Sequence, residues 1–289
     1  MSDPPDLDTG EQLLRADSAT LAAALQISVP EARREIQSLL IHALGIELAA
    51  LLAHPERVVE ARATAAYSQA FARRLGGEPM AYVLGEREFY SLAFEVTPAV
   101  LIPRPETELL VEMALDVLPE NANASVLDLG TGSGCIAVTL AKHRPAARIV
   151  AIDLSCVALA VAERNARRHR VSNAEFRSGS WFEPARSERF DLIVSNPPYV
   201  AEHDPHLLQR DLRAEPGLAL IAGPDGLEGL RAIIAHAPQH LLPGGVVLVE
   251  HGHDQAEAVA ELLDRAGFVD AIARTDLGGI LRVAGGRRP

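Results

Sequence analysis

The sequence is poor in cysteine, in positive charge and in long apolar runs, and each shortage excludes a class of protein. Only Cys135 and Cys156 occur in 289 residues. Their separation fits neither a zinc motif nor a redox motif, so we expect two reduced, buried thiols. Arginine and lysine number 27 against 39 acidic residues, which leaves a formal charge of −12. That balance argues against a partner held mainly through phosphate contacts.

The chain also lacks the features of a membrane or exported protein. It is 48% hydrophobic, but no uninterrupted apolar stretch is long enough to cross a bilayer. The first residues, Met-Ser-Asp-Pro-Pro-Asp, are acidic and rich in proline, unlike a signal or transit peptide. We therefore expect a cytoplasmic protein with no membrane partner.

The N-terminal part has the periodicity of helices between residues 11 and 77. Ser28 and Glu31 have the spacing of a capping box at a helix start. A later helix is expected to begin at Pro55 and to end at Gly76. Residues 1–80 are thus predicted to form a small helical bundle, which holds few catalytic residue types and suits substrate recognition.

A short segment of different character follows at residues 81–105. Aromatic and β-branched residues between Glu88 and Thr97 predict a hairpin or edge strands. Pro103 and Pro105 then stiffen the connection into a helix over residues 107–117. We interpret this segment as a β-hairpin connector between two domains.

Residues 106–289 alternate short apolar strands with helices, which indicates an α/β domain with a doubly wound, mostly parallel sheet. A tight glycine-rich turn before the last strand predicts that this strand is antiparallel. Seven strands are expected at residues 125–128, 147–153, 174–178, 190–195, 245–250, 268–273 and 279–284, and intervening helices at 134–143, 156–169, 227–237 and 254–266.

A glycine-rich loop follows the first of these strands and offers its backbone to a ligand. Its spacing is Gly-x-Gly-x-Gly, whereas a dinucleotide site shows Gly-x-Gly-x-x-Gly. An acidic residue just before the loop suits a ligand that carries an amino group. The alternative is a turn used only for packing a helix on the sheet. The candidate cofactor-binding residues are Asp128, Gly130, Thr131, Gly132, Ser133 and Gly134.

Two further residues favour a nucleoside as the ligand. Asp153 ends the second strand, about 20 residues after the glycine loop, where a carboxylate can hold ribose hydroxyls. It could equally cap the following helix. Trp181, the single tryptophan, follows the third strand and could flank an adenine, or could be a core aromatic. A nucleoside that also carries an amino acid is S-adenosylmethionine, and we expect it as the cofactor.

The most specific motif is Asn196-Pro197-Pro198-Tyr199, at the end of a buried strand. An amide nitrogen is a poor nucleophile and must be held in line with a methyl donor. The side-chain oxygen of Asn196 and the carbonyl of Pro197 can each accept one of its N–H bonds. The prolines restrict those acceptors, and Tyr199 supplies an apolar wall. We predict catalytic roles for Asn196, Pro197 and Tyr199, and substrate binding by all four residues.

Together these motifs resemble the class I S-adenosylmethionine-dependent methyltransferases that modify planar nitrogens. Two further segments narrow the resemblance, namely Leu84-Gly-Glu-Arg-Glu-Phe-Tyr90 and Leu101-Ile-Pro-Arg-Pro-Glu-Thr-Glu108. They are similar to segments of the release factor glutamine methyltransferases, the PrmC or HemK family. Glu215-Pro216, Asp225-Gly-Leu227 and Glu250-x-Gly252-x-x-Gln255 extend the match.

The resemblance implies a fold and a reaction. The fold would be a Rossmann-like methyltransferase domain at residues 106–289, joined to the helical bundle by the hairpin. The substrate would be the glutamine of the Gly-Gly-Gln motif in class I peptide chain release factors, and S-adenosylhomocysteine would be the product. Family members often carry Asp where this chain has Ser180, which puts an adenine contact at that position in question. His251 and His253 lack the further ligands of a metal site, so no metal is expected.

Other functions remain open at this point. A ribosomal-protein glutamine methyltransferase shares the Asn-Pro-Pro-Tyr motif, but usually has Arg-Ser-Pro where this chain has Arg104-Pro105-Glu106. A nucleic-acid adenine-N6 methyltransferase would flip a base into the same site, but should bring a basic groove. A non-catalytic binding module could lose the asparagine, which is intact here. We therefore expect a protein substrate and no stable nucleic-acid binding.

Overall fold

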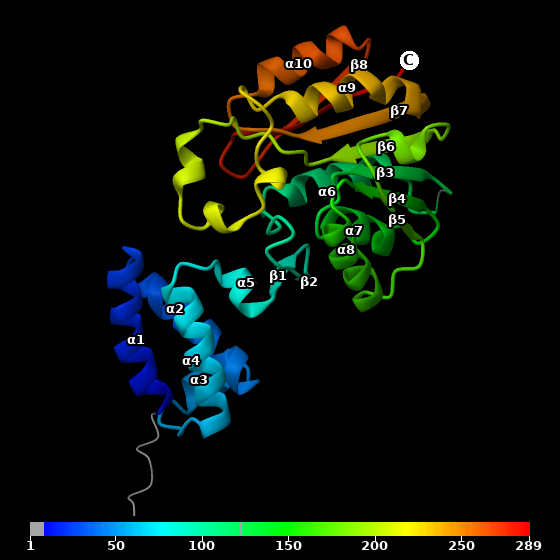
Figure 1. Ribbon diagram of the computed structural model, residues 1–289. Coiled ribbons are helices and arrows are strands. Elements are labelled where there is room, and N and C mark those ends of the chain that lie inside the picture. The colour runs from blue at the N-terminus through cyan, green and yellow to red at the C-terminus, as the bar shows by residue number, and fades with distance from the viewer. Residues whose placement is uncertain (1–8, 122) are drawn as a thin grey trace, which may run out of the picture. The chain divides into compact units, whose positions relative to one another are not determined.

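The computed structural model describes residues 9–121 and 123–289, and the chain divides into two compact units with the boundary between Gly85 and Glu86. Figure 1 shows the helices of the first unit and the central sheet of the second. Within the described residues, no helix combines the length and the apolar character needed to cross a membrane.

The first unit is a bundle of helices around a small apolar core. Its helices are α1 (Gly10–Leu25), α2 (Val29–Leu44), α3 (Leu48–Ala53), α4 (Ala61–Leu75) and α5 (Met80–Leu84). Leu21, Ile36 and Tyr67 are among its fully buried side chains. Ser28 caps α2 as predicted, because its hydroxyl accepts a hydrogen bond from the backbone N–H of Glu31.

The helix predicted to begin at Pro55 begins only at Ala61, so that prediction was wrong for six residues. The backbone of residues 55–58 forms hydrogen bonds and a β-bridge with the start of α1. The N–H of Glu11 donates to the carbonyl of Pro55 at 2.8 Å, and Thr9 forms a β-bridge with Val58. Residues 55 and 56 form a turn and Val58 forms the bridge, so these contacts hold the stretch outside a helix.

In its described residues the second unit contains a seven-stranded sheet, a hairpin and five α-helices. Their bounds are β1 (Glu86–Phe89), β2 (Leu92–Glu95), α6 (Thr107–Val117), β3 (Ser125–Leu129), α7 (Cys135–His143), β4 (Arg148–Asp153), α8 (Cys156–Arg168), β5 (Ala174–Ser178), β6 (Phe190–Ser195), α9 (Glu228–His240), β7 (Leu241–Glu250), α10 (Ala256–Arg265), β8 (Val269–Thr275) and β9 (Leu281–Arg287).

The sheet has the strand order β5-β4-β3-β6-β7-β9-β8, and β9 runs antiparallel to the other six strands. The Rossmann-like class and the antiparallel last strand are thereby confirmed. The strands alternate apolar side chains between the two faces, so that Val126 packs with α6 and α7 while Leu127 packs with α9 and α10. Figure 1 shows these helices on both sides of the sheet. The strand order reverses between β3 and β6, the point at which such sheets bind ligands.

The hairpin β1–β2 packs onto the second unit. Phe89 and Phe94 are buried in the same apolar cluster as α6 and α7. Asn165 of α8 accepts a hydrogen bond from the backbone N–H of Glu95 at 2.7 Å. These contacts hold the chain that leads into α6.

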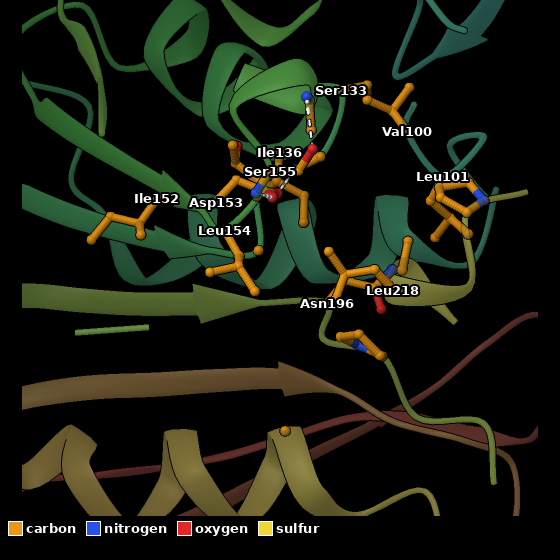
Figure 2. Close-up of a pocket in the computed structure, with 18 of the residues that line it drawn as sticks. Val100, Leu101, Ser133, Ile136, Ile152, Asp153, Leu154, Ser155, Asn196 and Leu218 are labelled. Carbon is orange, nitrogen blue, oxygen red and sulfur yellow. Dashed lines mark hydrogen bonds between the residues drawn. The ribbon is translucent and has the colours of Figure 1, made fainter. Parts of the chain in front are cut away.

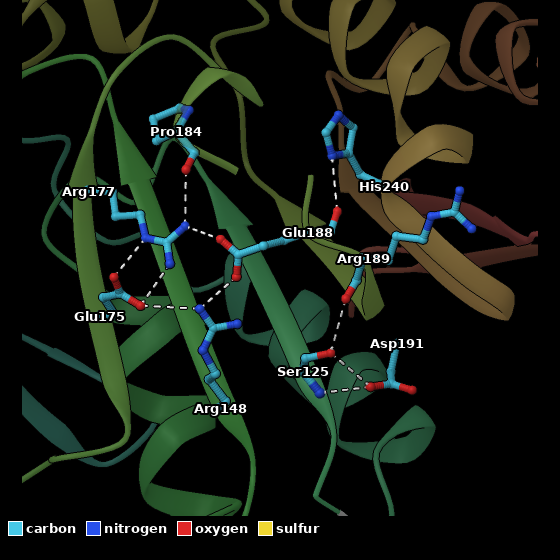
Figure 3. A network of polar contacts seen from close by, with 9 residues as sticks. All are labelled: Ser125, Arg148, Glu175, Arg177, Pro184, Glu188, Arg189, Asp191 and His240. Atoms are coloured by element: carbon cyan, nitrogen blue, oxygen red, sulfur yellow. Dashed lines mark hydrogen bonds and ion pairs between the residues drawn. The ribbon is translucent and has the colours of Figure 1, made fainter. Parts of the chain in front are cut away.

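A network of ion pairs lies near the amino-terminal ends of β4 and β6, away from the carboxyl ends of the strands (Figure 3). Arg148 bridges Glu175 and Glu188, and Arg177 contacts the same two carboxylates. The network joins β4 and β5 to the segment before β6. Because these groups are partly exposed, each pair contributes little to the free energy of unfolding.

Removal of a core side chain from the central strand should cost more than removal of an exposed one. Leu127 is 0% exposed, whereas Leu277 projects fully into solvent. We expect Leu127→Ala to lower the free energy of unfolding by about 3 kcal/mol. Leu277→Ala should change it by less than about 0.5 kcal/mol. Urea unfolding followed by fluorescence of Trp181 measures both, and equal effects would contradict the assignment of the core.

Candidate functional site

A cavity of about 340 Å³ lies at the carboxyl ends of β3, β4 and β6. It is lined by the glycine loop after β3, the residues after β4 and β5, the Asn-Pro-Pro segment, and parts of the loops 99–107 and 216–222. Figure 2 shows Asp153 and Ser155 together in this cavity, and Asn196 at the end of its strand. The predicted motifs, separate in sequence, thus meet at one site.

One buried hydrogen bond joins the two strand ends that carry the main motifs. The Ser195 hydroxyl donates to the carbonyl of Leu129 at 2.7 Å. Leu129 and Ser195 are register partners in adjacent parallel strands. The glycine loop and the Asn-Pro-Pro-Tyr motif therefore start side by side.

The glycine loop has a backbone that other residues rarely adopt. Gly130, Gly132 and Gly134 all have positive φ angles, of 72°, 54° and 79°. At Gly134 a Cβ atom would also lie 2.9 Å from the Cβ of Ala162 in α8. The first two glycines line the cavity, whereas Gly134 lets α7 and α8 pack closely.

Asp153 connects the loop to the next helix and lines the cavity. Its Oδ2 accepts the N–H of Gly132 and its Oδ1 accepts the N–H of Ser155, both at 2.8 Å. Burial raises the pKa of this carboxyl, while these backbone N–H groups oppose the rise. The cap of α8 itself is Ser155, whose hydroxyl accepts from the N–H of Ala158.

Asp128 lies beneath the loop and does not line the cavity. Thr131 donates to its Oδ2 at 2.6 Å, and its Oδ1 has no hydrogen-bond partner among the described residues. Complete burial raises the pKa of Asp128 to about 7. The structure therefore places this carboxylate as a support of the loop rather than on the wall of the cavity.

Trp181 lines the cavity and is held between two glycines. A Cβ at Gly130 or at Gly229 would lie 3.9 Å or 3.5 Å from its ring. Its φ of 44° is unusual for a residue with a side chain, and such strain is concentrated at functional sites. Ser180 lines the same cavity.

The residues of the Asn-Pro-Pro-Tyr motif occupy different positions. Asn196 and Pro198 line the cavity, whereas Pro197 is buried beside Gly229 and Tyr199 packs into the core below α9 and α10. The Nδ2 of Asn196 donates to Thr107 Oγ1 at 3.0 Å. Its Oδ1 is shielded from solvent and has no partner among the described residues. Asn196 therefore lines the cavity and keeps one buried acceptor without a partner.

The loop before α6 forms a further wall of the cavity. Glu215, whose side chain is fully buried, accepts the N–H of Ile102 at 3.0 Å and pairs with Arg104. These contacts tie the loop 99–107 to the loop 216–222, and both line the cavity. Sequence reasoning missed several polar groups of the site, among them Thr107 and Ser155. The only available signal was their place at helix starts.

Comparison with known proteins identifies the family. Residues 106–214 match the family described as the methyltransferase small domain, and residues 12–85 match the PrmC N-terminal domain. The release factor glutamine methyltransferase of Burkholderia pseudomallei is 48% identical over 280 residues, which cover 94% of this chain and 98% of the relative. That of Bordetella pertussis is 53% identical over 256 residues, or 88% and 94% of the two chains. The chain belongs to the release factor glutamine methyltransferase family.

Solved structures confirm the fold of this family member. A 16S rRNA methyltransferase of Thermus thermophilus, in complex with AdoMet and guanosine, superposes with a TM-score of 0.55 at 20% identity. The match covers 71% of this chain and 50% of that one. At this identity the likeness shows the fold alone.

The motifs Asp225-Gly-Leu227 and Glu250-x-Gly252-x-x-Gln255 support the Asn-Pro-Pro-Tyr segment. The Nε2 of Gln255 donates to the carbonyls of Tyr199 at 3.0 Å and of Gly226 at 3.3 Å. Its Oε1 accepts the N–H of Gly252 at 2.9 Å. Both the nitrogen and the oxygen of this buried amide have hydrogen-bond partners, so the segment is fixed from behind.

No cluster of three or more His, Cys, Asp or Glu side chains that could hold a metal ion is found in residues 9–121 and 123–289. His251 is buried, and its Nδ1 lies 2.8 Å from the carbonyl of Gly252. His253 is exposed.

Substitution of Gly226 should destabilise the Asn-Pro-Pro-Tyr segment by more than the positive φ of Gly226 alone predicts. A Cβ at Gly226, which has a φ of 74°, would lie 2.4 Å from the carbonyl oxygen of Tyr199. Gly279 has a similar φ of 78° and open space around it. We expect Gly279→Ala to cost about 1 kcal/mol of stability and Gly226→Ala about 3 kcal/mol. The comparison is made by urea unfolding, and equal losses would show that the contact with Tyr199 is unimportant.

Proposed function

We propose that this protein transfers the methyl group of S-adenosylmethionine to the side-chain amide nitrogen of a protein glutamine. The substrate is the glutamine of the Gly-Gly-Gln motif in class I peptide chain release factors, and the enzyme works in the cytoplasm. The relatives named above support the substrate class, and the acidic net charge favours a protein over a nucleic acid. Residues 1–80 would contribute to recognition of the release factor.

The observation that carries the chemistry is the unsatisfied Oδ1 of Asn196. A buried acceptor without a partner costs roughly 1–3 kcal/mol, so its retention at the wall of a cavity calls for a ligand. Thr107 accepts one N–H of the same amide, whereas the oxygen has no partner among the described residues. An N–H of a bound glutamine amide satisfies it, and the carbonyl of Pro197 can accept the other N–H.

The cavity has the features that S-adenosylmethionine requires. Gly130 and Gly132 expose backbone to it, and Asp153 and Trp181 lie on its wall. The hydroxyl of Ser133 is a further buried group without a hydrogen-bond partner among the described residues. We assign the amino-acid end of the cofactor to the glycine loop, its ribose to Asp153, and its adenine to Trp181 and Ser180. Asp128 acts from beneath through Thr131, and no metal is needed.

The chain's own residues contribute mainly by positioning. When bound, the cofactor supplies a methyl group on a positively charged sulfur, which is reactive without further activation. Asn196 and Pro197 orient the planar amide so that its nitrogen faces that methyl group. Orientation of this kind can supply roughly 7–11 kcal/mol of the barrier. The surplus proton leaves the nitrogen after transfer, and no histidine is required as a base before it.

A direct assay tests the substrate assignment. The purified protein should transfer a labelled methyl group from S-adenosylmethionine to a release factor, and not to the same factor with its Gly-Gly-Gln glutamine replaced by alanine. Ribosomal proteins and adenine-containing DNA should remain unlabelled. Equal labelling of the two release factors would overturn the assignment.

Substitutions of Asn196 and of Asp153 should affect different quantities, turnover in the first case and cofactor affinity in the second. Asn196→Ala removes the acceptor for the substrate amide, so turnover should fall by at least about 100-fold while cofactor affinity stays within a few-fold. Asp153→Ala removes the ribose contact, so cofactor affinity should fall by about tenfold or more. Calorimetric titration with the cofactor and the labelling assay measure the two quantities. Turnover of Asn196→Ala within a few-fold of the wild type would contradict the orienting role.

A further inference from the structure

A buried side-chain amide joins the glycine loop to the hairpin β1–β2. Asn165, on α8, is 0% exposed and does not line the cavity. Its Nδ2 donates to the carbonyl of Ser133 at 2.9 Å and to the carbonyl of Glu95 at 3.0 Å. Its Oδ1 accepts the backbone N–H of Glu95 at 2.7 Å. This one side chain therefore contacts both the loop after β3 and the end of β2.

The backbone of Glu95 fixes the direction in which the Asn165 amide points. A backbone N–H can only donate, and a backbone carbonyl can only accept. The N–H of Glu95 therefore selects the oxygen of Asn165, and the carbonyls of Glu95 and Ser133 select its NH₂ group. A flipped amide would place its NH₂ group against an N–H and its oxygen against two carbonyls. The hairpin thus sets the orientation of the donor that the Ser133 carbonyl receives.

In the glycine loop, the peptide unit between Ser133 and Gly134 is held at both ends. Asn165 holds its carbonyl, and its N–H, on Gly134, donates to the carbonyl of Thr131 at 2.8 Å. One turn before Asn165 in α8, Ala162 lies so close that a Cβ at Gly134 would be 2.9 Å from the Cβ of Ala162. Helix α8 therefore fixes this part of the loop by a hydrogen bond and by direct packing.

Ser133 is the loop residue whose placement matters for a ligand. It lines the cavity (Figure 2) and is 2% exposed. Its hydroxyl is buried and has no hydrogen-bond partner among the described residues. Such a group is costly unless a ligand satisfies it. The position of the hydroxyl depends on the backbone of Ser133, whose carbonyl is held by Asn165.

We propose that Asn165 is a positioning residue for cofactor binding, because it holds Ser133 so that the Ser133 hydroxyl meets the amino-acid end of S-adenosylmethionine. The proposal rests on the proposed function, which assigns that end of the cofactor to the glycine loop. Asn165 itself touches no ligand. The hairpin that follows the helical bundle thereby becomes part of the support of the cofactor site.

Asn165→Asp tests this role at nearly constant size. An aspartate keeps an oxygen for the N–H of Glu95, but it lacks the NH₂ group that serves the two carbonyls. We expect the affinity for S-adenosylmethionine, measured by calorimetric titration, to fall about tenfold or more. The stoichiometry of the same titration gives the fraction of folded protein, so a loss of affinity is distinguished from a loss of folded molecules.

Asn173→Asp is the matched control. The Nδ2 of Asn173 also donates to backbone carbonyls, those of Ala141, Arg144 and Ala147, at 3.2, 3.1 and 2.9 Å. None of these four residues lines the cavity. This variant should also be less stable in urea, but its cofactor affinity should stay within about threefold of the wild type. An equal loss of affinity in the two variants would show that Asn165 acts only through general stability and would overturn the proposal.

A double-mutant cycle tests whether Asn165 acts through Ser133. Ser133→Ala removes the unpaired hydroxyl and should lower cofactor affinity about tenfold. Adding Asn165→Asp to this variant should lower the affinity by less than about a further threefold, because the group that Asn165 positions is already absent. Losses that multiply fully, or an unchanged affinity in Ser133→Ala, would overturn the positioning role.

The calorimetric result is independent of the protein substrate, which separates this proposal from the proposed function. Wild-type cofactor affinity in Asn165→Asp, with methyl transfer to the release factor intact in the wild type, would overturn the positioning role alone. The expected loss of affinity in Asn165→Asp, with no methyl transfer to the release factor by the wild type, would overturn the proposed substrate alone.

Discussion

The hydrogen bond from Ser195 to the carbonyl of Leu129 is the constraint on which the rest of the site depends. It lies inside the sheet, where an unpaired hydroxyl or carbonyl would be costly, and so it joins the ends of β3 and β6. These strands are neighbours at the point where the strand order reverses. A ligand held by the glycine loop after β3 is therefore next to a group held by the motif after β6.

Around this junction, some polar side chains hold the walls of the cavity in place, and others are available to contact a ligand. Gln255 and Glu215 lie behind the walls and form hydrogen bonds with the backbone or with neighbouring side chains, and Asp128 supports the glycine loop through Thr131. Asn196 and Ser133 retain unpaired atoms at the cavity. A site that must orient a planar amide benefits from this division, because the contacting groups can only be as well placed as their supports.

The sequence predicted most of the fold because its signals are local. Apolar runs of strand length and glycine turns located all seven strands of the sheet, and the Ser28 cap located α2. The error at Pro55 has a physical reason. A proline at a helix start is a local signal, but the turn and bridge at residues 55–58 are held by the start of α1, which is about 45 residues earlier in the chain.

By itself, the sequence determined the family, the chemistry of a planar nitrogen and the motifs that carry it, since these depend on residue types at short spacings. Only the tertiary structure decided which of those residues reach the cavity. Asp128 and Tyr199 belong to the motifs but lie behind the wall, whereas Thr107 comes from a distant element and meets Asn196. Burial and hydrogen-bond direction arise when separate elements pack together, and no local pattern of residues encodes them.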